Sequence, residues 1–414
     1  MRGPTPGEDF RNLGIIGAAG LVGMIGTVAL VAGAVVSNSS FVDFGFEARI
    51  IHPIPVVIEN PVDGTNRLYG TVTTQAGDQH TGFMRWDQNE GSWADLLDAS
   101  KVSDRGSRLS GVRFGNIARI EPLGSDEARV VMRDGSEHLL EGGSTDLGSS
   151  LRSLDVLHPE TGEASYQWRD IASVEFSAAP SDVLAREQRL YGTLTSRDGD
   201  SFTGYITWDM DEVFTSDILD GDVGSESLEV PFGAIREISR NSSRSARIVM
   251  IDGAEMILDG SNDVDSSNRG ITVSDPALGQ VVVEWDDFAS VRFHEAEQEV
   301  GYDSFEAVRQ LTGTLTLESG ETLAGAIRWD GDEAATWELL NGNRDDVEYL
   351  IEFSKVAGIE KLSRGARVEL RDGRVFDLTG SNDVDADNSG IAIMVDGEER
   401  VVSWREFASL RLDF

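Results

Sequence analysis

The sequence predicts an all-β protein: three tandem repeats of a small β-domain behind one N-terminal transmembrane helix. First, a segment that begins Leu68-Tyr-Gly-Thr recurs at Leu190 and at Leu311, a period of about 120 residues that suits a domain. Second, each copy alternates apolar and polar residues around glycine-bearing turns, as β-hairpins do. Third, residues 13–36 have no charged side chain, and a helix of that length would be roughly 36 Å long, enough to cross a bilayer.

Composition limits the possible functions. The 414 residues include 35 Lys and Arg against 73 Asp and Glu, a formal net charge of −38, which repels nucleic acid phosphates and anionic lipid headgroups. We therefore expect no nucleic acid partner. The 40% hydrophobic content argues for packed domains and against a disordered acidic chain. The chain has no cysteine, which excludes disulfides, thiolate nucleophiles and cysteine metal sites.

Residues 1–12 form a short tail before the apolar segment, which we interpret as a retained transmembrane helix over residues 13–36. A cleaved signal peptide is the alternative, because Ala32-Gly-Ala34 has the small-x-small form of a cleavage site. The apolar run exceeds the roughly 7 to 15 residues usual for a signal peptide, which favours retention. Arg2 and Arg11 precede the helix, so the positive-inside rule predicts a single-pass protein with its bulk outside the cytoplasm.

Glycine recurs at every third position along this helix. Small residues let a second helix approach closely, which is how helices associate where lipid provides no hydrophobic driving force. The spacing predicts a packed intramembrane partner, although glycine is also simply tolerated in membrane helices. The predicted packing residues are Gly14, Gly17, Gly20, Gly23 and Gly26. Three aromatic residues predicted at the membrane interface follow the helix: Phe41, Phe44 and Phe46.

Residues 37–66 contain three prolines between apolar runs, which predicts an extended, semi-rigid connector. The three copies then occupy residues 67–177, 189–294 and 310–414. Each copy opens with one hairpin pattern and carries a second hairpin pattern further on, as in Ala246-Arg-Ile-Val-Met-Ile-Asp-Gly253.

Both halves of each copy close with apolar residues spaced by three and then by two, as at Ile171, Val174 and Phe176 after Trp168. This spacing predicts one short helical or 3₁₀ turn that leads into a strand. Hairpin, middle strands, 3₁₀ turn and closing strand is the order of small SH3-like or Sm-like barrels. Each copy is therefore predicted to be either a pair of such barrels or one fused double-barrel β-domain.

Trp86, Trp208 and Trp329 stand at corresponding places in the three copies and are predicted core residues. The residues that follow them have apolar spacing suited to a short helical turn, which would close the end of the barrel. The predicted helical turns cover Trp93–Leu97, Phe214–Leu219 and Trp337–Leu340.

Asp-rich loops in the second and third copies are the candidate metal sites. They run from Gly260 to Ile271 and from Gly380 to Ile391, and their alternate acidic residues would direct several oxygens to one point, as Ca²⁺ requires. The candidate ligands are Asp263, Asp265, Asn268, Asp383, Asp385 and Asp387. The loops partly resemble EF-hand loops but lack the glutamate at the twelfth position. The alternative is an Asx-rich loop whose side chains cap their own backbone, and no other cofactor is predicted.

Catalysis has little support in the sequence, and we predict that the protein is not an enzyme. The five histidines occupy unmatched places in the copies. Asp209, Asp211 and Glu212 would suit a carboxylate pair of the glycosidase kind. We instead expect an exposed acidic turn, because carboxylates are the usual surface residues of so acidic a chain. The sequence has no phosphate-binding glycine loop, nucleophile elbow or metalloprotease helix.

The recurring patterns Gly192-Thr-Leu-Thr, Ile327-Arg-Trp-Asp and Gly260-Ser-Asn-Asp-Val resemble tandem-repeat β-domain proteins of the bacterial envelope. The resemblance covers roughly residues 67–414. It implies no activity, because the function of those proteins is undefined.

Together these features predict a non-catalytic, membrane-anchored scaffold or accessory subunit. Its helix would pack among the integral membrane protein subunits of a larger complex, and its β-array would stabilise the extrinsic face of that complex. Photosynthetic and other energy-converting complexes have subunits of this plan. The alternative is a calcium-supported surface module that binds glycans or peptides, and an envelope hydrolase that uses the acidic turns ranks third.

Overall fold

The computed structural model describes residues 62–103, 106–142, 144–158 and 162–414, all of which belong to one unit of the chain, His52–Phe414. The tail 1–12, the predicted transmembrane helix 13–36 and most of the connector 37–66 lie outside the described residues. The same holds for the residues assigned to the membrane, namely Gly14, Gly17, Gly20, Gly23, Gly26, Phe41, Phe44 and Phe46. Within the described ranges, no helix is long and apolar enough to cross a membrane.

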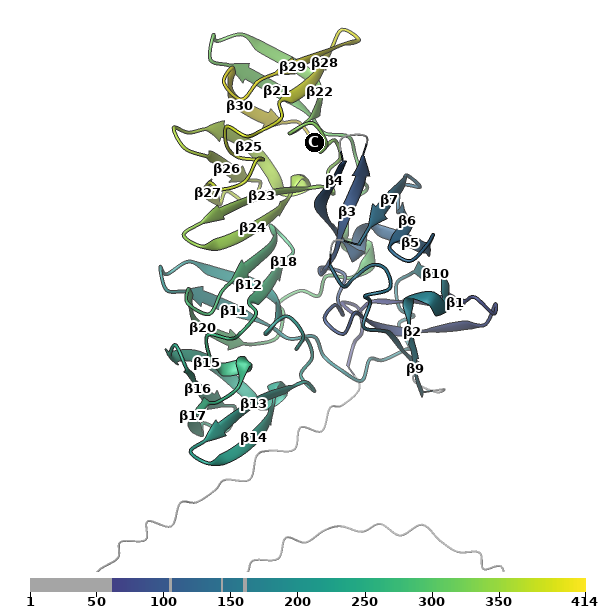
Figure 1. The fold of residues 1–414 in the computed structure, drawn as a ribbon, viewed down its shortest axis with the longest axis vertical. Helices are drawn as coiled ribbons and strands as arrows, with labels where there is room; N and C mark the ends of the chain where they lie inside the picture. Colours follow the sequence, from purple (N-terminus) through teal and green to yellow (C-terminus); the bar gives the residue numbers. More distant parts are fainter. Residues whose placement is uncertain (1–61, 104–105, 143, 159–161) are drawn as a thin grey trace, which may run out of the picture. The chain divides into compact units, whose positions relative to one another are not determined.

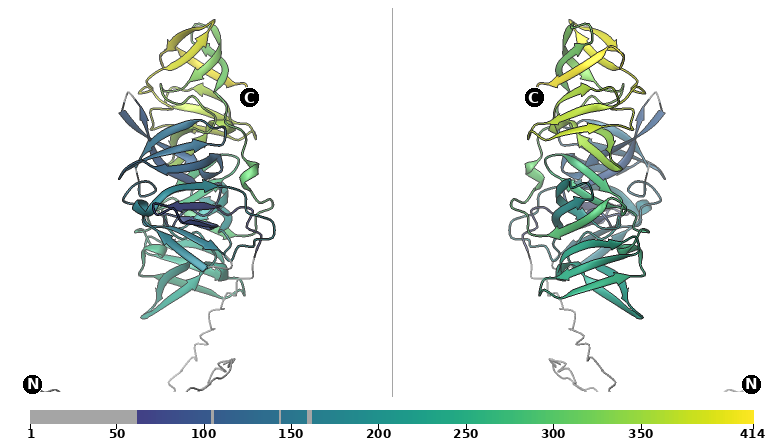
Figure 2. Two further views of the ribbon diagram at one scale, coloured as in Figure 1. Left: turned by 90° about the vertical axis from the view of Figure 1, so that its right-hand side faces the viewer. Right: turned by 90° about the vertical axis from the view of Figure 1, so that its left-hand side faces the viewer.

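The described part of the chain is all-β, as predicted, and consists of three antiparallel sheets joined by loops and 3₁₀ turns (Figures 1 and 2). The first sheet contains β1 (Tyr69–Thr74), β2 (Gln79–Trp86), β3 (Leu96–Ser103), β4 (Gly106–Arg113), β5 (Ile117–Pro122), β6 (Glu127–Met132), β7 (Glu137–Glu141), β8 (Leu154–His158), β9 (Gly162–Tyr166) and β10 (Ile171–Phe176).

The second sheet contains β11 (Tyr191–Ser196), β12 (Ser201–Thr207), β13 (Ile218–Val223), β14 (Glu226–Pro231), β15 (Ile235–Ser242), β16 (Ser245–Met250), β17 (Glu255–Asp259), β18 (Ile271–Asp275), β19 (Gly279–Val283) and β20 (Phe288–Phe293), with β23 (Leu339–Arg344) and β24 (Val347–Glu352). The third contains β21 (Thr312–Leu317), β22 (Thr322–Arg328), β25 (Val356–Lys361), β26 (Ala366–Leu370), β27 (Val375–Leu378), β28 (Ile391–Val395), β29 (Glu398–Val402) and β30 (Phe407–Leu412). The 3₁₀ turns are η1 (Phe114–Asn116), η2 (Trp168–Asp170), η3 (Phe232–Ala234), η4 (Asn262–Val264), η5 (Tyr302–Ser304) and η6 (Phe353–Lys355).

The three sheets have corresponding strand orders. The first sheet runs β4-β3-β7-β6-β5-β10-β1-β2-β8-β9, and the second begins β14-β13-β17-β16-β15-β20-β11-β12-β18-β19. The third runs β27-β26-β25-β30-β21-β22-β28-β29, which is the same order without its first two strands. Those two strands, β23 and β24, extend the second sheet, because β24 pairs with β19. The pairings form rows of strands, and closure into barrels stays a prediction.

Both predicted hairpins are confirmed in each sheet. The opening hairpin pairs β1 with β2, β11 with β12 and β21 with β22, and the second pairs β6 with β7, β16 with β17 and β26 with β27. Gly199 turns the opening hairpin of the second sheet with a φ of 91°, which side chains with a Cβ rarely adopt. The predicted turn before a strand is confirmed as a 3₁₀ turn at η1, η2, η3 and η6. It is wrong before β20 and β30, where residues 285–287 and 404–406 form ordinary hydrogen-bonded turns.

The helical turns predicted over Trp93–Leu97, Phe214–Leu219 and Trp337–Leu340 are wrong. Each region forms one hydrogen-bonded turn and then enters β3, β13 or β23 directly. In the first sheet, the Asp95 carboxylate accepts the backbone N–H groups of Gly91 and Ser92 at 2.9 and 2.8 Å. These bonds satisfy the N–H donors of the turn, so no further helical turn is needed. The two apolar residues that follow, Leu96 and Leu97, begin the strand β3, which pairs with β4.

The three recurring tryptophans are core residues, as predicted. Trp86, Trp208 and Trp329 are each 0% exposed. Each indole Nε1–H donates to a backbone carbonyl of a loop that follows a hairpin, at 2.8 to 2.9 Å, and the acceptors are Asp146, Asp263 and Asp383. An unpaired indole N–H in the core would cost about 1–3 kcal/mol, so the same bond fixes this loop over the core in all three sheets.

The second and third sheets share one buried apolar cluster, whereas the first sheet has its own. The strand pair that joins them is β19 with β24, where Gly279 lies opposite Ile351. A Cβ at Gly279 would lie 1.9 Å from the Leu350 carbonyl oxygen, so only glycine permits this approach.

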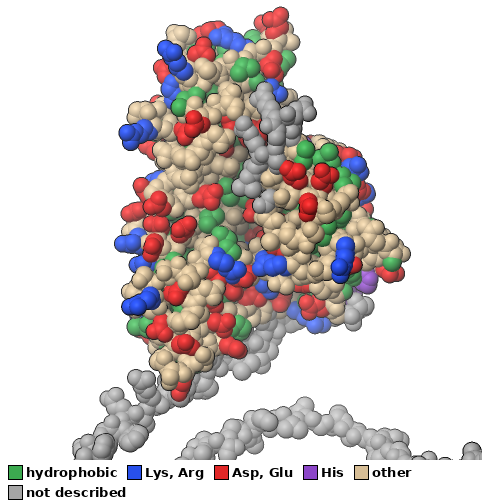
Figure 3. Space-filling view, in the orientation of Figure 1, with side chains coloured by type: hydrophobic (Ala, Val, Ile, Leu, Met, Phe, Trp, Pro, Cys, Tyr) green, Lys and Arg blue, Asp and Glu red, His purple; other side chains and the backbone are tan. Residues whose placement is uncertain are grey.

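Acidic side chains are scattered over the face shown in Figure 3, with Lys and Arg between them. Ion pairs at the surface of the third sheet include Arg367 of β26 with Asp377 of β27 at 2.8 Å, and Arg400 of β29 with Glu321, which precedes β22, at 2.7 Å. Pairs this exposed contribute little to stability, so the fold does not depend on them.

We predict that Gly279→Ala destabilises the protein by about 1–3 kcal/mol more than Gly162→Ala, because overpacking a close backbone contact costs this much. Gly162 holds the same place in the β8–β9 hairpin and also has a positive φ, 88° against 147° at Gly279, but a Cβ there would meet nothing within 4 Å. Both variants therefore place alanine at a positive φ, but only Gly279→Ala disrupts the contact between β19 and β24. Urea unfolding of the two variants measures the difference, and equal losses would contradict the role given to β19 and β24.

Candidate functional site

The most concentrated set of polar groups lies in the turn after the core tryptophan. The turn has the form Trp-Asp-x-Asx-Glu and follows β2, β12 and β22: Trp86 to Glu90, Trp208 to Glu212 and Trp329 to Glu333. In each, the Trp and Glu residues form a β-bridge that closes the turn. Asp209 and Met210 take φ values of 47° and 65°, a conformation that side chains tolerate only where the surroundings enforce it.

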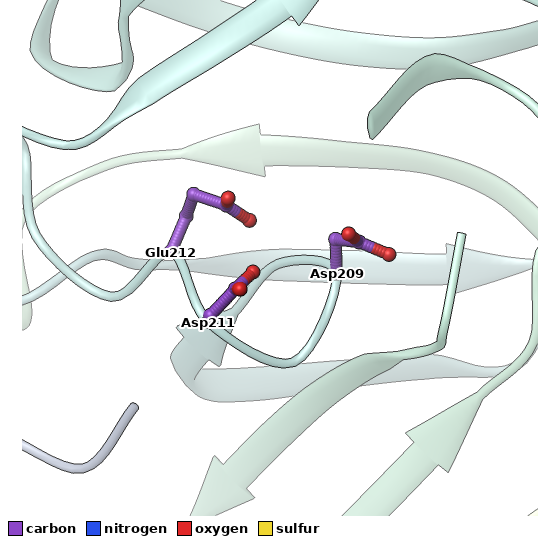
Figure 4. Close-up of side chains that lie close together, drawn as sticks. All are labelled: Asp209, Asp211 and Glu212. Atoms are coloured by element: carbon purple, nitrogen blue, oxygen red, sulfur yellow. The ribbon is translucent and has the colours of Figure 1, made fainter. Parts of the chain in front are cut away.

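In the second sheet this turn holds the only group of three carboxylates within 4.8 Å found in the described part of the chain. The group is Asp209, Asp211 and Glu212 (Figure 4). Three clustered carboxylates suit either a divalent cation or proton-transfer chemistry. Which of these is open to them depends on what the oxygens already contact.

Asp209 is 0% exposed, so the expectation of an exposed acidic turn is wrong for this residue. Its Oδ1 accepts the backbone N–H of Arg269, and its Oδ2 accepts the Arg269 Nε and Nη2 groups at 3.1 and 2.8 Å. The Asn262 amide also donates to Oδ2. The carboxylate is therefore paired with a guanidinium and supplied with four donors, which compensates the cost of burying its charge.

The Arg269 guanidinium also donates to Asp211. Hydrogen bonds with Asp211 and with Asp209 raise the pKa of Arg269, so the cation is always present. A metal ion bound by these carboxylates would have to displace the Arg269 guanidinium, because both cations would compete for the same carboxylate oxygens.

Glu212 differs from its two neighbours. Burial, followed by the nearby charges of Asp263 and Asp211, raises the pKa of Glu212 to about 10. The carboxyl is therefore protonated at neutral pH, and its Oε2 has no hydrogen-bond partner among the described residues. A neutral carboxylic acid is a poor metal ligand and does not act as a nucleophile.

The same arrangement recurs in the other two sheets. Burial raises the pKa of Glu90 and of Glu333 well above the usual value. Asp87 accepts the Arg152 backbone N–H at 2.6 Å and its Nε at 3.1 Å, as Asp209 does with Arg269. Asp330 accepts donors from Asn382 and Ser389. Because the arrangement is common to all three sheets, its shared role is to hold the loop and the turn together.

The candidate calcium ligands of the second sheet accept backbone N–H groups, from β13 in one case and from their own loop in the other two. The Asp263 carboxylate accepts the Asp220 N–H at 2.7 Å, and burial raises its pKa to about 6. Asp265 accepts the Ser267 N–H at 2.7 Å, and the Asn268 side chain accepts the Gly270 N–H at 3.0 Å.

The third sheet is similar. Asp383 accepts the Asn341 N–H at 2.7 Å, Asp385 accepts the Asp387 N–H at 2.9 Å, and Asp387 is exposed. In neither loop do the candidate ligands form a cluster of three carboxylates, as judged over the described residues. The contacts favour the Asx-rich loop over the calcium site, which stays an untested prediction.

Sequence analysis missed a second set of functional groups, the acids that cap the turns before β3, β13 and β23. Asp95, Asp217 and Glu338 each accept backbone N–H groups of their own turn and also pair with a cation from another sheet. The cations are Arg189, Arg85 and Lys101, respectively. In all three copies an acidic residue stands at the same distance after the core tryptophan, and this pattern could have indicated the set. The cation that pairs with each acid is visible only in the folded structure.

We predict that Glu212→Gln removes a pH dependence of stability. The protonated Glu212 carboxyl contributes stability that is fully present below the usual glutamate pKa and is lost as pH rises towards the folded value of about 10. Between about pH 5 and about pH 9 the free energy of unfolding should therefore fall more in the wild type than in the variant, by up to about 1.4 kcal/mol per pH unit. Urea unfolding at both pH values tests this, with exposed Glu226→Gln on β14 as control. Equal slopes in wild type and Glu212→Gln would show that Glu212 is ionised.

We also expect the melting temperature to be the same in excess calcium and in EDTA. An ion bound only by the folded state would stabilise it by mass action, whereas capped loop carboxylates offer no free ligand set. A rise of the melting temperature in calcium that Asp385→Asn abolishes would contradict this expectation and support the calcium site.

Comparison with known proteins does not assign this site. No protein-family model matches the chain, and no curated protein matches it. The role of the acidic turns and of the loops above them is therefore argued from their own contacts.

Proposed function

We propose that this protein is a non-catalytic scaffold, anchored by residues 13–36 in a membrane, whose β-array stabilises the extrinsic face of an integral membrane complex. In this proposal the array consists of three copies of one SH3-like or Sm-like β-unit, each a barrel pair or a fused double barrel. The corresponding strand orders and the recurring tryptophan-to-loop bond support the three copies.

The observation that carries the proposal is the set of buried cations that cross between the sheets. Arg189, which precedes β11, has a fully buried side chain and contacts the Asp95 carboxylate of the first sheet at 3.0 Å. Ser274 of β18 donates to the same carboxylate at 3.2 Å. Removing one partner of a buried pair typically costs about 3–5 kcal/mol, so this contact strongly favours one arrangement of the two sheets.

A second crossing joins the first sheet to the junction of the other two. Arg113, at the end of β4, donates to the Gly279 carbonyl at 2.7 Å and contacts the Glu352 carboxylate at 3.4 Å. Both side chains are almost fully buried. The cation therefore lies where β19 meets β24 and ties the first sheet to this strand pair of the second sheet. A framework fixed in this way suits a role in holding other subunits in place.

The acidic groups support the non-catalytic part of the proposal. Asp209 and its counterparts Asp87 and Asp330 are occupied by internal donors, and Glu212 is protonated at neutral pH. Their chemistry is used to secure the fold. A glycosidase needs an accessible, ionised carboxylate beside its protonated acid, and Asp209 is buried and held by Arg269.

The membrane part of the proposal rests on the sequence. The uncharged run 13–36 would cross the bilayer, the glycines at every third position would contact a helix of a partner subunit, and the bulk of the chain would lie outside the cytoplasm. The partners would be integral membrane protein subunits, of a photosynthetic or other energy-converting complex for example. Nucleic acid is not proposed as a partner because of the net charge of −38.

Purification of the full chain from native membranes after crosslinking tests the proposal. We expect integral membrane subunits to co-purify, and we expect a Gly17→Leu, Gly20→Leu double variant to lose them because leucine would prevent close helix approach. Val22→Leu with Val28→Leu is the matched control, since it keeps the segment apolar and leaves the glycines in place. A monodisperse chain without associated membrane proteins would contradict the scaffold.

A further inference from the structure

An aromatic side chain fills a corresponding surface position on the first and third sheets. On the first sheet the position lies beside η1, where the segment between β20 and β21 crosses. Phe305 of that segment covers Gly115 so closely that a Cβ there would lie 2.2 Å from the ring. Tyr302 stacks beside Trp93 with ring centroids 4.6 Å apart, and Arg133 lies 4.4 Å over the Tyr302 ring.

The third sheet repeats the arrangement beside η6. Arg371 lies 4.4 Å over the ring of Phe414 and donates from Nε to the Ser354 carbonyl at 2.9 Å. Arg133 makes the corresponding bond to the Gly115 carbonyl at 3.4 Å. The same surface position therefore holds an aromatic residue in both sheets, although this residue comes from a different segment of the chain in each.

Backbone bonds identify the corresponding position of the second sheet, beside η3. Gly233 donates to the Thr215 carbonyl at 2.7 Å, as Gly115 does to Trp93 at 2.9 Å. Ile251 donates to the Ala234 carbonyl at 2.9 Å, and Arg133 donates to Asn116 at 3.0 Å. Gly233 thus corresponds to Gly115, and Ile251 corresponds to Arg133.

In the second sheet this position is an open hollow of about 180 Å³. Its apolar wall includes Phe232, Ile235, Phe293 and Ile251, and the Ile251 side chain is 62% exposed. The difference from both filled positions is the apolar Ile251, which stands where the first and third sheets have Arg133 and Arg371. The lining of the hollow also includes two exposed charged residues, Arg236 and Glu295, one of each sign.

We infer that this hollow is a docking site for a segment of a partner protein that presents aromatic residues three positions apart, with an acidic residue between them. The chain itself supplies the template, because Tyr302-Asp-Ser-Phe305 fills the first position with this spacing. There, the intervening Asp303 pairs with Arg133 at 3.6 Å. Arg236 offers the matching charge at the hollow.

The inference deepens the proposed scaffold by naming an interaction surface, and it rests on that proposal only for the identity of the partner. Binding of a peptide by the purified chain needs no membrane helix and no native complex. Failure of the peptide test would leave the membrane association untouched, and loss of membrane association would leave the hollow untouched.

The probe is a fluorescein-labelled peptide with the sequence of residues 299–308, and fluorescence anisotropy with the full chain at physiological ionic strength is the measurement. We expect saturable binding that weakens at least about tenfold, roughly 1.4 kcal/mol, when both aromatic residues of the peptide are replaced by alanine. Gly233→Leu should weaken binding to the same degree, because its side chain would occupy the hollow. Ile251→Asp serves the same purpose at an exposed position where folding is not at risk.

Ile257→Asp is the matched control, since Ile257 is 50% exposed on β17 of the same sheet but does not line the hollow. Arg236→Glu should weaken binding of this peptide more than binding of the same peptide with Asp303→Asn, which keeps Glu299 and Glu306. Equal affinity of wild type and both hollow variants, or no binding of the aromatic peptide up to about 1 mM, would overturn the inference.

Discussion

The rest of the structure depends on how each sheet secures the loop above its core tryptophan. Trp208 is completely buried and must place its indole N–H on an acceptor, which is the carbonyl of Asp263. The Asp209 next to it is held by Arg269 of the same loop. The hairpin and the loop, about 60 residues apart in sequence, are therefore fixed to one another by a neutral and an ionic contact at adjacent positions. The first sheet repeats both contacts with Trp86, Asp87 and Arg152, whereas in the third sheet Asp330 accepts the Asn382 amide and the Ser389 backbone N–H.

This arrangement explains why so acidic a chain can bury carboxylates. Some buried carboxylates are paired with a cation and several N–H donors, some are held in the protonated form, and others, such as Asp263, accept backbone N–H groups. Asp209 is of the first kind and Glu212 is of the second. The turn-capping acids of the sheets extend the rule, because each combines backbone donors with a cation from another sheet. Acidic residues that a composition count assigns to the surface thus help to hold sheets together.

The junction of the second and third sheets shows how corresponding units can differ in pairing. The hairpin β23–β24 lies in sequence with the third sheet but pairs with β19, because Gly279 allows the backbones to approach. The strand that corresponds to β19 in the third sheet, β29, carries Glu398 at the matching position and is free on that side in the described chain. A charged edge residue discourages further strand addition.

The sequence by itself determined the all-β class, the hairpins, the 3₁₀ turns and the tryptophan core, because these follow from local alternation, glycine turns and apolar spacing. It did not reveal that Asp209 is buried, that β23 and β24 pair with a distant strand, or that Asp95 meets Arg189. Those facts depend on which surfaces face one another, and periodicity within one segment has no information about a partner more than 90 residues away. The tertiary structure decided them, since a buried charge is placed only where folding brings its counter-charge and donors together.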